Sequence, residues 1–179
     1  MGKGFFALQS KVIMDIYSRF IVGYAVADNM RAENNITALK MAFKTRKCNS
    51  FDNKLIHHSD RGGQYISDDY TKMLTDAKIK ISMCNEVYEN AHVERVNGTI
   101  KNQYLEHRNI TNFQQLEIEL KATVNTYNYN RPHSALGGRT PFAFEQYIKE
   151  LNQLDKPKVA IWTCDLSKFQ NSNQCIIQF

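Results

Sequence analysis

One acidic residue of this sequence stands where a carboxylate could bind a metal ion. Asp60 follows a short β-rich run and precedes the Arg61–Gly63 turn, whose two glycines leave room close to the backbone. Hard cations such as Mg²⁺ prefer oxygen ligands, so an acid at such a turn can be a ligand. An Asp that merely caps the turn explains the same residues equally well. From the residues alone, both interpretations of Asp60 stay open.

A second acid, Glu94, belongs to a polar face of a predicted helix. Glu94 lies beside the apolar stripe of that helix. Its own face also carries Asn90, Asn97 and Lys101, at offsets of four, three and seven residues. The face therefore combines a carboxylate, amides and a cation, which suits a phosphate near a metal ion. A solvated helix face is the ordinary explanation of the same pattern.

A third polar group follows the last long predicted helix, in the Pro/Gly-containing run 130–138. Arg131 and His133 lie in this run, and Tyr127 and Tyr129 precede it. Such a mixture can reach phosphates and stack on bases. A polar helix end with its tyrosines packed on the core is an equally good explanation.

The elements that would position these residues form an α/β pattern. Two β-rich runs, 11–17 and 20–26, flank a polar Ser18-Arg19 break and predict a hairpin. The remaining elements are predicted from apolar periodicity and from helix start and stop signals. In chain order they are a helix over 32–46, a strand over 55–60, a helix over 68–77, a strand over 78–83, helices over 90–104, 112–128 and 141–148, and a possible strand over 158–162. This order predicts a mixed sheet flanked by helices.

Composition narrows the classes of protein. The 179 residues are 42% hydrophobic, which suffices for one buried core, and the net charge of +5 favours an anionic partner. No run approaches the length of a membrane span and no signal peptide is visible, so we expect a cytoplasmic protein without membrane contact. The four cysteines form no zinc-ligand spacing.

Three runs of the sequence resemble, in the same order, the motif blocks of bacterial insertion-sequence transposases with a retroviral-integrase-like DDE core. The runs are Ile56–Tyr65, Tyr88–Lys101 and Tyr127–Leu136, and the likeness covers nearly all of residues 11–148. The resemblance implies a ribonuclease-H-like fold. It also implies DNA cutting and joining by two Asp and one Glu that hold two divalent cations, Mg²⁺ or Mn²⁺.

The resemblance assigns roles to individual residues. Asp60 matches the second carboxylate of the family and Glu94 the third, so both would be catalytic metal ligands. Lys101 becomes a candidate phosphate contact near that site. Asn97, on the face of Glu94, and Arg131 and His133 in the later loop are further candidate nucleic-acid contacts.

The first carboxylate of the family has no counterpart before the predicted hairpin. In the family it lies on the opening strand, in an Asp-x-Thr type context, and Asp15 matches a non-catalytic Asp of the second strand instead. We therefore expect the central strand of the sheet to be missing from an integrase-like domain over 1–150, followed by a C-terminal extension over 151–179. Unless another segment fills the gap, the sheet would be split, and Asp60 and Glu94 would hold cations weakly.

Two functions of different classes follow from the resemblance. The first is a transposase core, encoded by a truncated copy, that binds element ends and target DNA and joins strands by metal-dependent phosphoryl transfer. The second is a catalytically inactive, DNA-binding or oligomerising remnant. Either protein would associate with its own copies or with an intact transposase, and enzymatic activity stays open because the first Asp is absent from the matched region.

Overall fold

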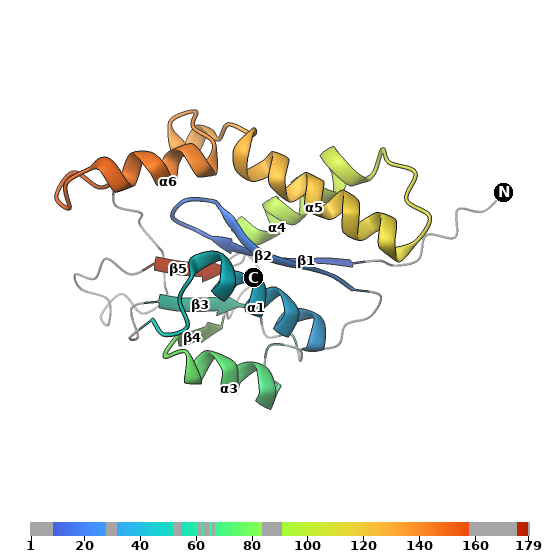
Figure 1. Cartoon of the computed structure of the whole chain (residues 1–179), viewed down its shortest axis with the longest axis horizontal. Coiled ribbons are helices and arrows are strands. Elements are labelled where there is room, and N and C mark those ends of the chain that lie inside the picture. The colour runs from blue at the N-terminus through green and yellow to red at the C-terminus, as the bar shows by residue number, and fades with distance from the viewer. Residues whose placement is uncertain are drawn as a thin grey trace.

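The core of the computed structural model is a five-stranded mixed sheet with the order β2-β1-β5-β3-β4 (Figure 1). The structure describes residues 9–27, 32–51, 55–60, 62, 65, 67–83, 91–157 and 175–178. The fold class expected from the sequence, a mixed sheet flanked by helices, is confirmed.

The predicted hairpin forms one side of the sheet. β1 (Gln9–Asp15) and β2 (Ile21–Ala27) pair antiparallel over six residue pairs, with a bulge near the end of β1. The Asp15 N–H closes the hairpin by donating to the carbonyl of Phe20 at 2.9 Å. The connection is thus longer than the two polar residues Ser18-Arg19 that mark it in the sequence.

The other side of the sheet is parallel. β3 (Leu55–Ser59) pairs with β4 (Lys80–Met83), with Ile56 opposite Lys80 and Ser59 opposite Met83. The strand predicted over 78–83 is therefore confirmed, although it begins two residues later.

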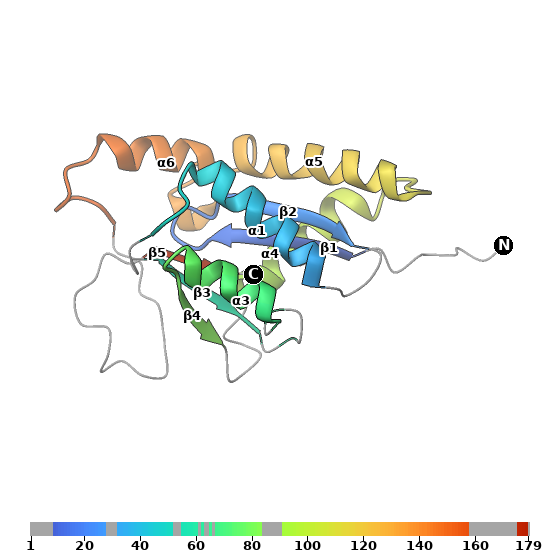
Figure 2. The ribbon, with the colours of Figure 1, turned by 60° about the horizontal axis from the view of Figure 1, so that its bottom comes forward.

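The central strand of the sheet comes from the C-terminal extension. β5 (Cys175–Gln178) lies between β1 and β3, parallel to β3 and antiparallel to β1 (Figures 1 and 2). One row of the sheet runs from Asp15 through Ile177 to His57. The expected vacancy at the centre of the sheet is thereby filled, so the sheet is continuous. The strand predicted over 158–162 lies outside the described residues.

Helices cover both faces of the sheet because the strands alternate two apolar surfaces. Ile13 and Val22 face α1 (Ala32–Arg46) and α3 (Asp68–Asp76) in one core cluster. Val12 and Met14 face the opposite side, where α4 (Ala91–Gly98) and α5 (Phe113–Tyr129) supply the apolar partners. Figure 1 shows the two layers, with α5 above the sheet and α3 below it.

Gly23 allows α1 to lie directly against β2. A Cβ atom at this position would collide with the carbonyl oxygen of Ala38 on α1. Only glycine, which lacks a Cβ atom, permits so close an approach of two backbones.

The helix predicted over 90–104 is divided into two types of helix. After α4 the chain continues as the π-helix η2 (Thr99–Leu105), in which the Glu106 N–H donates to the Lys101 carbonyl five residues earlier. Gly98, a poor helix former, stands at the junction. The sequence offsets that place Lys101 on the face of Glu94 assume a regular α-helix and therefore do not hold across this junction.

The last two helices begin at residues whose side chains accept hydrogen bonds from the first turn. Asn112 caps α5 by accepting from the Gln115 N–H, and Thr140 caps α6 (Pro141–Glu150) by accepting from the Ala143 N–H. The short 3₁₀ helix η3 (Ser134–Leu136) lies between them. In the part of the chain that the structure describes, no helix is both long and apolar enough to cross a bilayer.

Candidate cation and nucleic-acid site

Asp60 lies at the carboxyl edge of the sheet, immediately after β3. Its side chain is exposed, and Oδ1 accepts the N–H of Gly62 at 2.9 Å. Oδ2 has no hydrogen-bond partner among the described residues. The carboxylate is thus oriented by the turn while one oxygen stays available, so capping the turn and binding a cation are compatible roles for this residue.

His57 fixes β3 against the helix layer below it. The ring is buried, and Nε2 shares a hydrogen bond of 2.9 Å with the Tyr70 hydroxyl on α3. Burial lowers the pKa of His57 to about 3, so the ring is neutral at pH 7. A neutral, buried histidine is a positioning residue of the strand that carries Asp60.

Glu94 is exposed on α4, between the buried residues Val93 and Val96. Asn97, one turn later, is half-buried, and its Oδ1 atom is buried without a hydrogen-bond partner in the described part of the chain. Lys101 is exposed on η2. The carboxylate of Glu94 is therefore accessible to a ligand from solvent.

Both carboxylate oxygens of Asp15 bind other groups of the protein. Its Oδ2 pairs with the Arg46 guanidinium at 2.7 Å, and its Oδ1 accepts the backbone N–H groups of Tyr17 at 2.9 Å and Ser18 at 3.3 Å. Arg46 also pairs with Glu145 on α6 at 2.8 Å. Burial raises the pKa of Asp15, and Arg46 opposes this shift. The network ties the hairpin to α1 and α6.

The sheet register separates Asp15 from Asp60. Asp15 lies level with His57, two residues before the end of β3 and two strands away. Strand spacings and rises place its Cα atom roughly 12 Å from that of Ser59. Together with the contacts to Arg46, this position agrees with the assignment of Asp15 as a non-catalytic residue.

The loop after α5 joins the polar side chains of two elements. The Arg131 guanidinium donates to Gln103 Oε1 on η2 at 2.7 Å. The His133 ring packs edge-on against Tyr127, with ring centroids 4.8 Å apart, and its Nε2 atom is buried. Tyr127 is buried, whereas Tyr129 is 45% exposed. Both interpretations of this loop thus apply in part, because Arg131 reaches outward while Tyr127 and His133 pack inward.

The structure brings some of the predicted residues together and leaves others apart. Arg131 contacts η2, which also carries Lys101. No hydrogen bond or ion pair joins Asp60 to Glu94 among the described residues. Within the same residues no group of three or more His, Cys, Asp or Glu side chains could hold a metal ion. Asp60 and Glu94 are the donor type that Mg²⁺ or Mn²⁺ requires, but the described part of the chain does not provide a third ligand beside them.

Sequence reasoning did not single out three cationic or titratable residues that act on one another in the structure. Arg19, His92 and Arg95 influence one another electrostatically in the structure, but nothing in their spacing marks them as neighbours. Asp165, in the run Asp165-Leu-Ser167, precedes β5 by ten residues in the sequence and lies outside the described residues. Its Asp-x-Ser spacing is similar to the Asp-x-Thr type context of the first carboxylate in the family that the sequence resembles.

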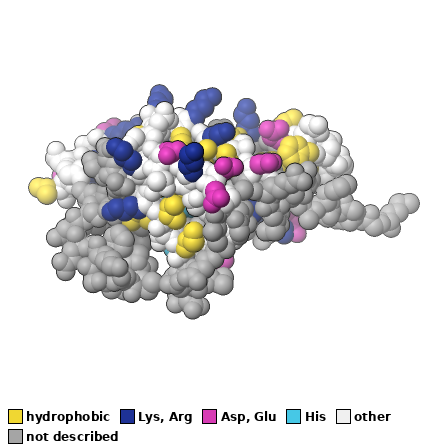
Figure 3. Space-filling model, turned by 90° about the horizontal axis from the view of Figure 1, so that it is seen from below, with side chains coloured by type: hydrophobic (Ala, Val, Ile, Leu, Met, Phe, Trp, Pro, Cys, Tyr) yellow, Lys and Arg dark blue, Asp and Glu magenta, His cyan; other side chains and the backbone are white. Residues whose placement is uncertain are grey.

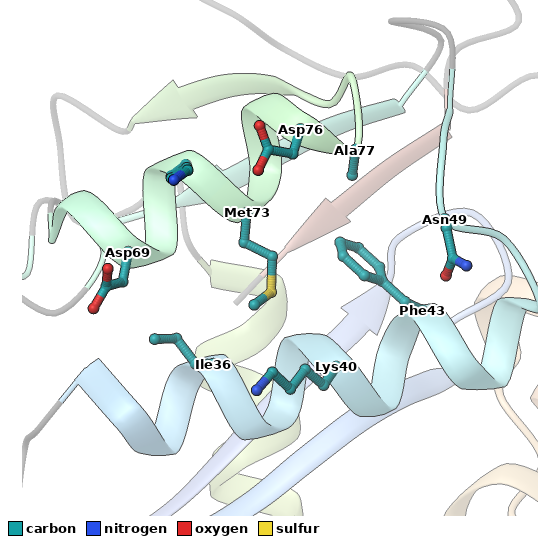
Figure 4. Close-up of a pocket in the computed structure, with 9 residues that line it drawn as sticks. Ile36, Lys40, Phe43, Asn49, Asp69, Met73, Asp76 and Ala77 are labelled. Carbon is teal, nitrogen blue, oxygen red and sulfur yellow. The ribbon is translucent and has the colours of Figure 1, made fainter.

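One groove of the described surface is lined by none of these residues. It runs between α1 and α3 and is lined by side chains of both helices and of adjoining loops (Figure 4). The lining residues are Ile36, Lys40, Phe43, Asn49, Asp69, Lys72, Met73, Asp76 and Ala77. Figure 3 shows Lys and Arg side chains beside Asp and Glu side chains on the face seen from below. This mixture of charges does not favour an anion.

Two family models described as "Integrase core domain" match the chain, one over residues 4–87 and the other over 75–141. The chain is 36% identical over 142 residues to the IS600 insertion element 31 kDa protein of Shigella sonnei, which corresponds to 78% of this chain and 51% of that protein. It is 36% identical over 141 residues to the transposase InsF of IS3A from Escherichia coli K12, corresponding to 75% and 46%. The chain therefore spans about half the length of these relatives.

Solved structures show the same fold at low identity. The catalytic core domain of HTLV-2 integrase, in complex with magnesium, superposes with a TM-score of 0.55 at 19% identity, covering 76% of this chain and 92% of that one. A chain of the simian T-cell lymphotropic virus intasome superposes with a TM-score of 0.61 at 17% identity, covering 87% and 53%. The expected ribonuclease-H-like, integrase-type fold is confirmed.

Proposed function

Because the chain belongs to the integrase core family, we propose that it is a catalytic-core protein of transposition that binds DNA and joins DNA strands. The observation that carries the proposal is Asp60. This acid follows a buried strand at the carboxyl edge of the sheet, is exposed, and keeps one carboxylate oxygen without a partner among the described residues. The insertion-sequence transposases to which the chain is similar supply the reaction class.

Asp60 and Glu94 are the residues that would hold Mg²⁺ or Mn²⁺. A bound pair of such cations stabilises the attacking and the leaving oxygen of an in-line phosphoryl displacement. The Gly62 N–H fixes Oδ1 of Asp60, which leaves Oδ2 to face a ligand. Lys101 and Arg131 are placed on or against η2, where positive charge can hold a phosphodiester.

The partners that this function requires are DNA and further copies of the protein. The similar solved chains are parts of an intasome and of dimeric and trimeric catalytic cores. By analogy, we expect this chain to associate with itself or with a full-length transposase. A protein that acts on the DNA of a bacterial insertion element would work in the cytoplasm.

A catalytically inactive DNA-binding remnant is the second candidate function. The observation that favours it is the lack, among the described residues, of a three-ligand group that could hold a metal ion. Two carboxylates alone would bind a cation weakly and orient it poorly.

Metal-dependent nicking and joining of a labelled duplex oligonucleotide separates the two candidates. The full chain is incubated with Mg²⁺, Mn²⁺ or EDTA, and the products are resolved on a denaturing gel. A transposase core produces nicked or joined strands only with metal, and Asp60→Asn and Glu94→Gln abolish them. The matched control is Asp68→Asn, which removes an exposed Asp from the first turn of α3.

Two results would decide against strand transfer by Asp60. Products that survive Asp60→Asn would remove this residue from the reaction, and an absence of products in both metals would favour the inactive remnant. An Asp165→Asn variant belongs in the same assay. Loss of product in that variant would identify the segment that leads into β5 as the source of the third carboxylate.

A further inference from the structure

Three arginines from separate parts of the chain gather beside the end of α5. Arg19 lies in the β1–β2 connection, Arg95 on α4, and Arg131 just after α5. We call Arg19, Arg95 and Arg131 the arginine cluster. Neither the relatives' names nor the sequence motifs assign a joint role to these residues.

Packing contacts hold the hairpin connection against the end of α5. The buried Asn128 side chain accepts the Ile21 N–H at 2.9 Å and donates to the Ile21 carbonyl at 3.0 Å. The rings of Phe20 and Tyr129 meet edge-on, with centroids 6.0 Å apart. Arg19 precedes Phe20 and Arg131 follows Tyr129 by two residues, so these contacts bring both arginines to one place.

Electrostatic effects show that the charges of the cluster act on one another. Burial lowers the pKa of Arg19, Tyr127 opposes this shift, and the charge of Arg95 lowers the pKa further. Asp15 acts in the same direction as Tyr127. Burial lowers the pKa of His92, and the charges of Arg19 and Arg95 lower it further. Burial raises the pKa of the Tyr127 hydroxyl to about 12, and the charges of Arg131 and Arg19 oppose this shift. Like charges thus lie close enough to repel, and a bound anion would relieve that repulsion.

The backbone at Arg19 adopts a conformation that non-glycine residues rarely use. Its φ is +59°, in the left-handed region. The other non-glycine residues with positive φ in the described part, Lys47 and Lys78, follow the ends of α1 and α3, where this conformation is ordinary. In the hairpin connection, Arg19 holds this conformation at a cost in backbone energy.

No ion pair joins the cluster to an acid among the described residues, although the charge of Asp15 acts on Arg19. Arg46 pairs with Asp15 and Glu145, and Arg108 pairs with Glu119 at 2.6 Å. Arg131 instead donates to the neutral amide of Gln103, and no ion pair involves Arg19 or Arg95 in this part of the chain. The cluster therefore keeps its positive charge, unlike the arginines that stabilise the fold.

We propose that the arginine cluster is a binding site for the phosphodiester backbone of DNA. The planar guanidinium groups donate several hydrogen bonds and stay charged, which suits phosphate oxygens. Contacts to phosphates position a nucleic acid without reading its sequence. The proposal rests on the proposed function, to which it adds Arg19 and Arg95 as DNA-positioning residues.

The salt dependence of DNA binding tests the proposal. Binding of the full chain to a fluorescent duplex oligonucleotide is measured by anisotropy in EDTA, over a series of salt concentrations. Each phosphate contact contributes about 0.9 to the slope of log affinity against log salt. We expect Arg95→Gln to lower the slope by about 1. The triple variant Arg19→Asn, Arg95→Gln, Arg131→Gln should lower it by about 2 to 3.

The variants are chosen so that they change the charge of the cluster without preventing folding. Asn adopts the left-handed conformation of residue 19 more readily than most residues, and Arg95 is exposed, so neither change should prevent folding. Arg108→Gln is the matched control, because its charge is already paired with Glu119. This variant should keep the slope of the unmodified chain.

An unchanged slope in the triple variant, or an equal loss in Arg108→Gln, would overturn the proposal. Metal-dependent cleavage that persists together with an unchanged slope would show that the cluster is wrong while the proposed function stands. Absence of any DNA binding by the unmodified chain at low salt would overturn both. Retention of binding by Asp60→Asn, with the slope lowered only by the cluster variants, would support the cluster independently of catalysis.

Discussion

Asp15 and Asp60 stand at the ends of two strands that flank β5, yet the two carboxylates differ in burial and in the groups that they bind. Asp15 is buried and is held by Arg46 and by two backbone N–H groups. Asp60 is exposed and, among the described residues, receives one N–H, from Gly62. An acid whose bonding capacity is used by the protein stabilises the fold. An acid with an unused oxygen at the sheet edge is available to a ligand.

Removal of the cation from the Asp15 network should have the largest effect on stability. Arg46→Met leaves the carboxylates of Asp15 and Glu145 without their common partner. Because these groups are largely buried, we expect the free energy of unfolding to fall by about 3 kcal/mol, measured by urea denaturation. Arg108→Met, which breaks an exposed pair with Glu119, should cost less than about 1 kcal/mol. Equal losses of unfolding free energy in the two variants would mean that the ion pairs of Arg46 with Asp15 and Glu145 stabilise the fold no more than an exposed pair does.

The strand between the two acids should be the next most sensitive region. Ile177 pairs with Asp15 on one side and His57 on the other, and proline there removes an N–H from a central strand. We expect Ile177→Pro to lower the free energy of unfolding by about 1–3 kcal/mol, because proline cannot donate a hydrogen bond within the ladder of a central strand. Ile177→Val keeps the N–H and serves as the control. Unchanged stability in the proline variant would place the C-terminal segment outside the sheet.

His57, which lies on the same row of the sheet as Asp15, gives the stability a dependence on pH. The folded-state pKa of His57 is about 3, below the ordinary value of 6.5. The unfolded chain therefore takes up a proton as the pH falls below about 6.5, while the folded chain does not. This contribution lowers stability by up to about 1.4 kcal/mol per pH unit in that range.

Replacement of His57 by Asn isolates this dependence. Unfolding free energies of both proteins are compared between pH 7 and pH 5, so that contributions from His92 and His133, whose pKa values are also lowered, cancel. The unmodified chain should lose more stability than the variant over this interval. Parallel pH profiles would show that His57 takes up its proton over the same pH range in the folded chain as in the unfolded chain.

Removal of the charge of Asp60 should have the smallest effect on stability. Asn keeps an oxygen that can accept the Gly62 N–H, and the side chain is exposed. We expect Asp60→Asn to change the free energy of unfolding by less than about 0.5 kcal/mol in the urea assay. A large loss would indicate that Asp60 has a structural role like that of Asp15.

Local patterns sufficed to predict most elements of the fold. The helix over 32–46 matches α1 because its apolar residues repeat at helical spacing, and the hairpin is visible in its two β-rich runs. Long-range pairing could not be predicted in the same way. The four residues of β5 carry no strong local signal, and their position depends on unpaired edges of β1 and β3 that are distant in the sequence.

Sequence motifs could predict single candidate residues of the site. Asp60 and Glu94 could be named from their contexts, and both are exposed in the structure. The arginine cluster could not be predicted from local patterns. Arg19 and Arg131 are brought together by the Asn128–Ile21 hydrogen bonds between α5 and β2, which join segments that are distant in the sequence. The π-helix was missed because its apolar pattern resembles that of an α-helix.

Direct measurement of Mn²⁺ binding tests the central claim, that Asp60 and Glu94 provide ligands for a divalent cation whereas Asp15 does not. Isothermal titration of the full chain with Mn²⁺ should show binding that Asp60→Asn and Glu94→Gln each weaken at least tenfold. Asp68→Asn, the matched exposed control on α3, should bind like the unmodified chain. Equal affinity of Asp60→Asn and the unmodified chain would contradict the claim.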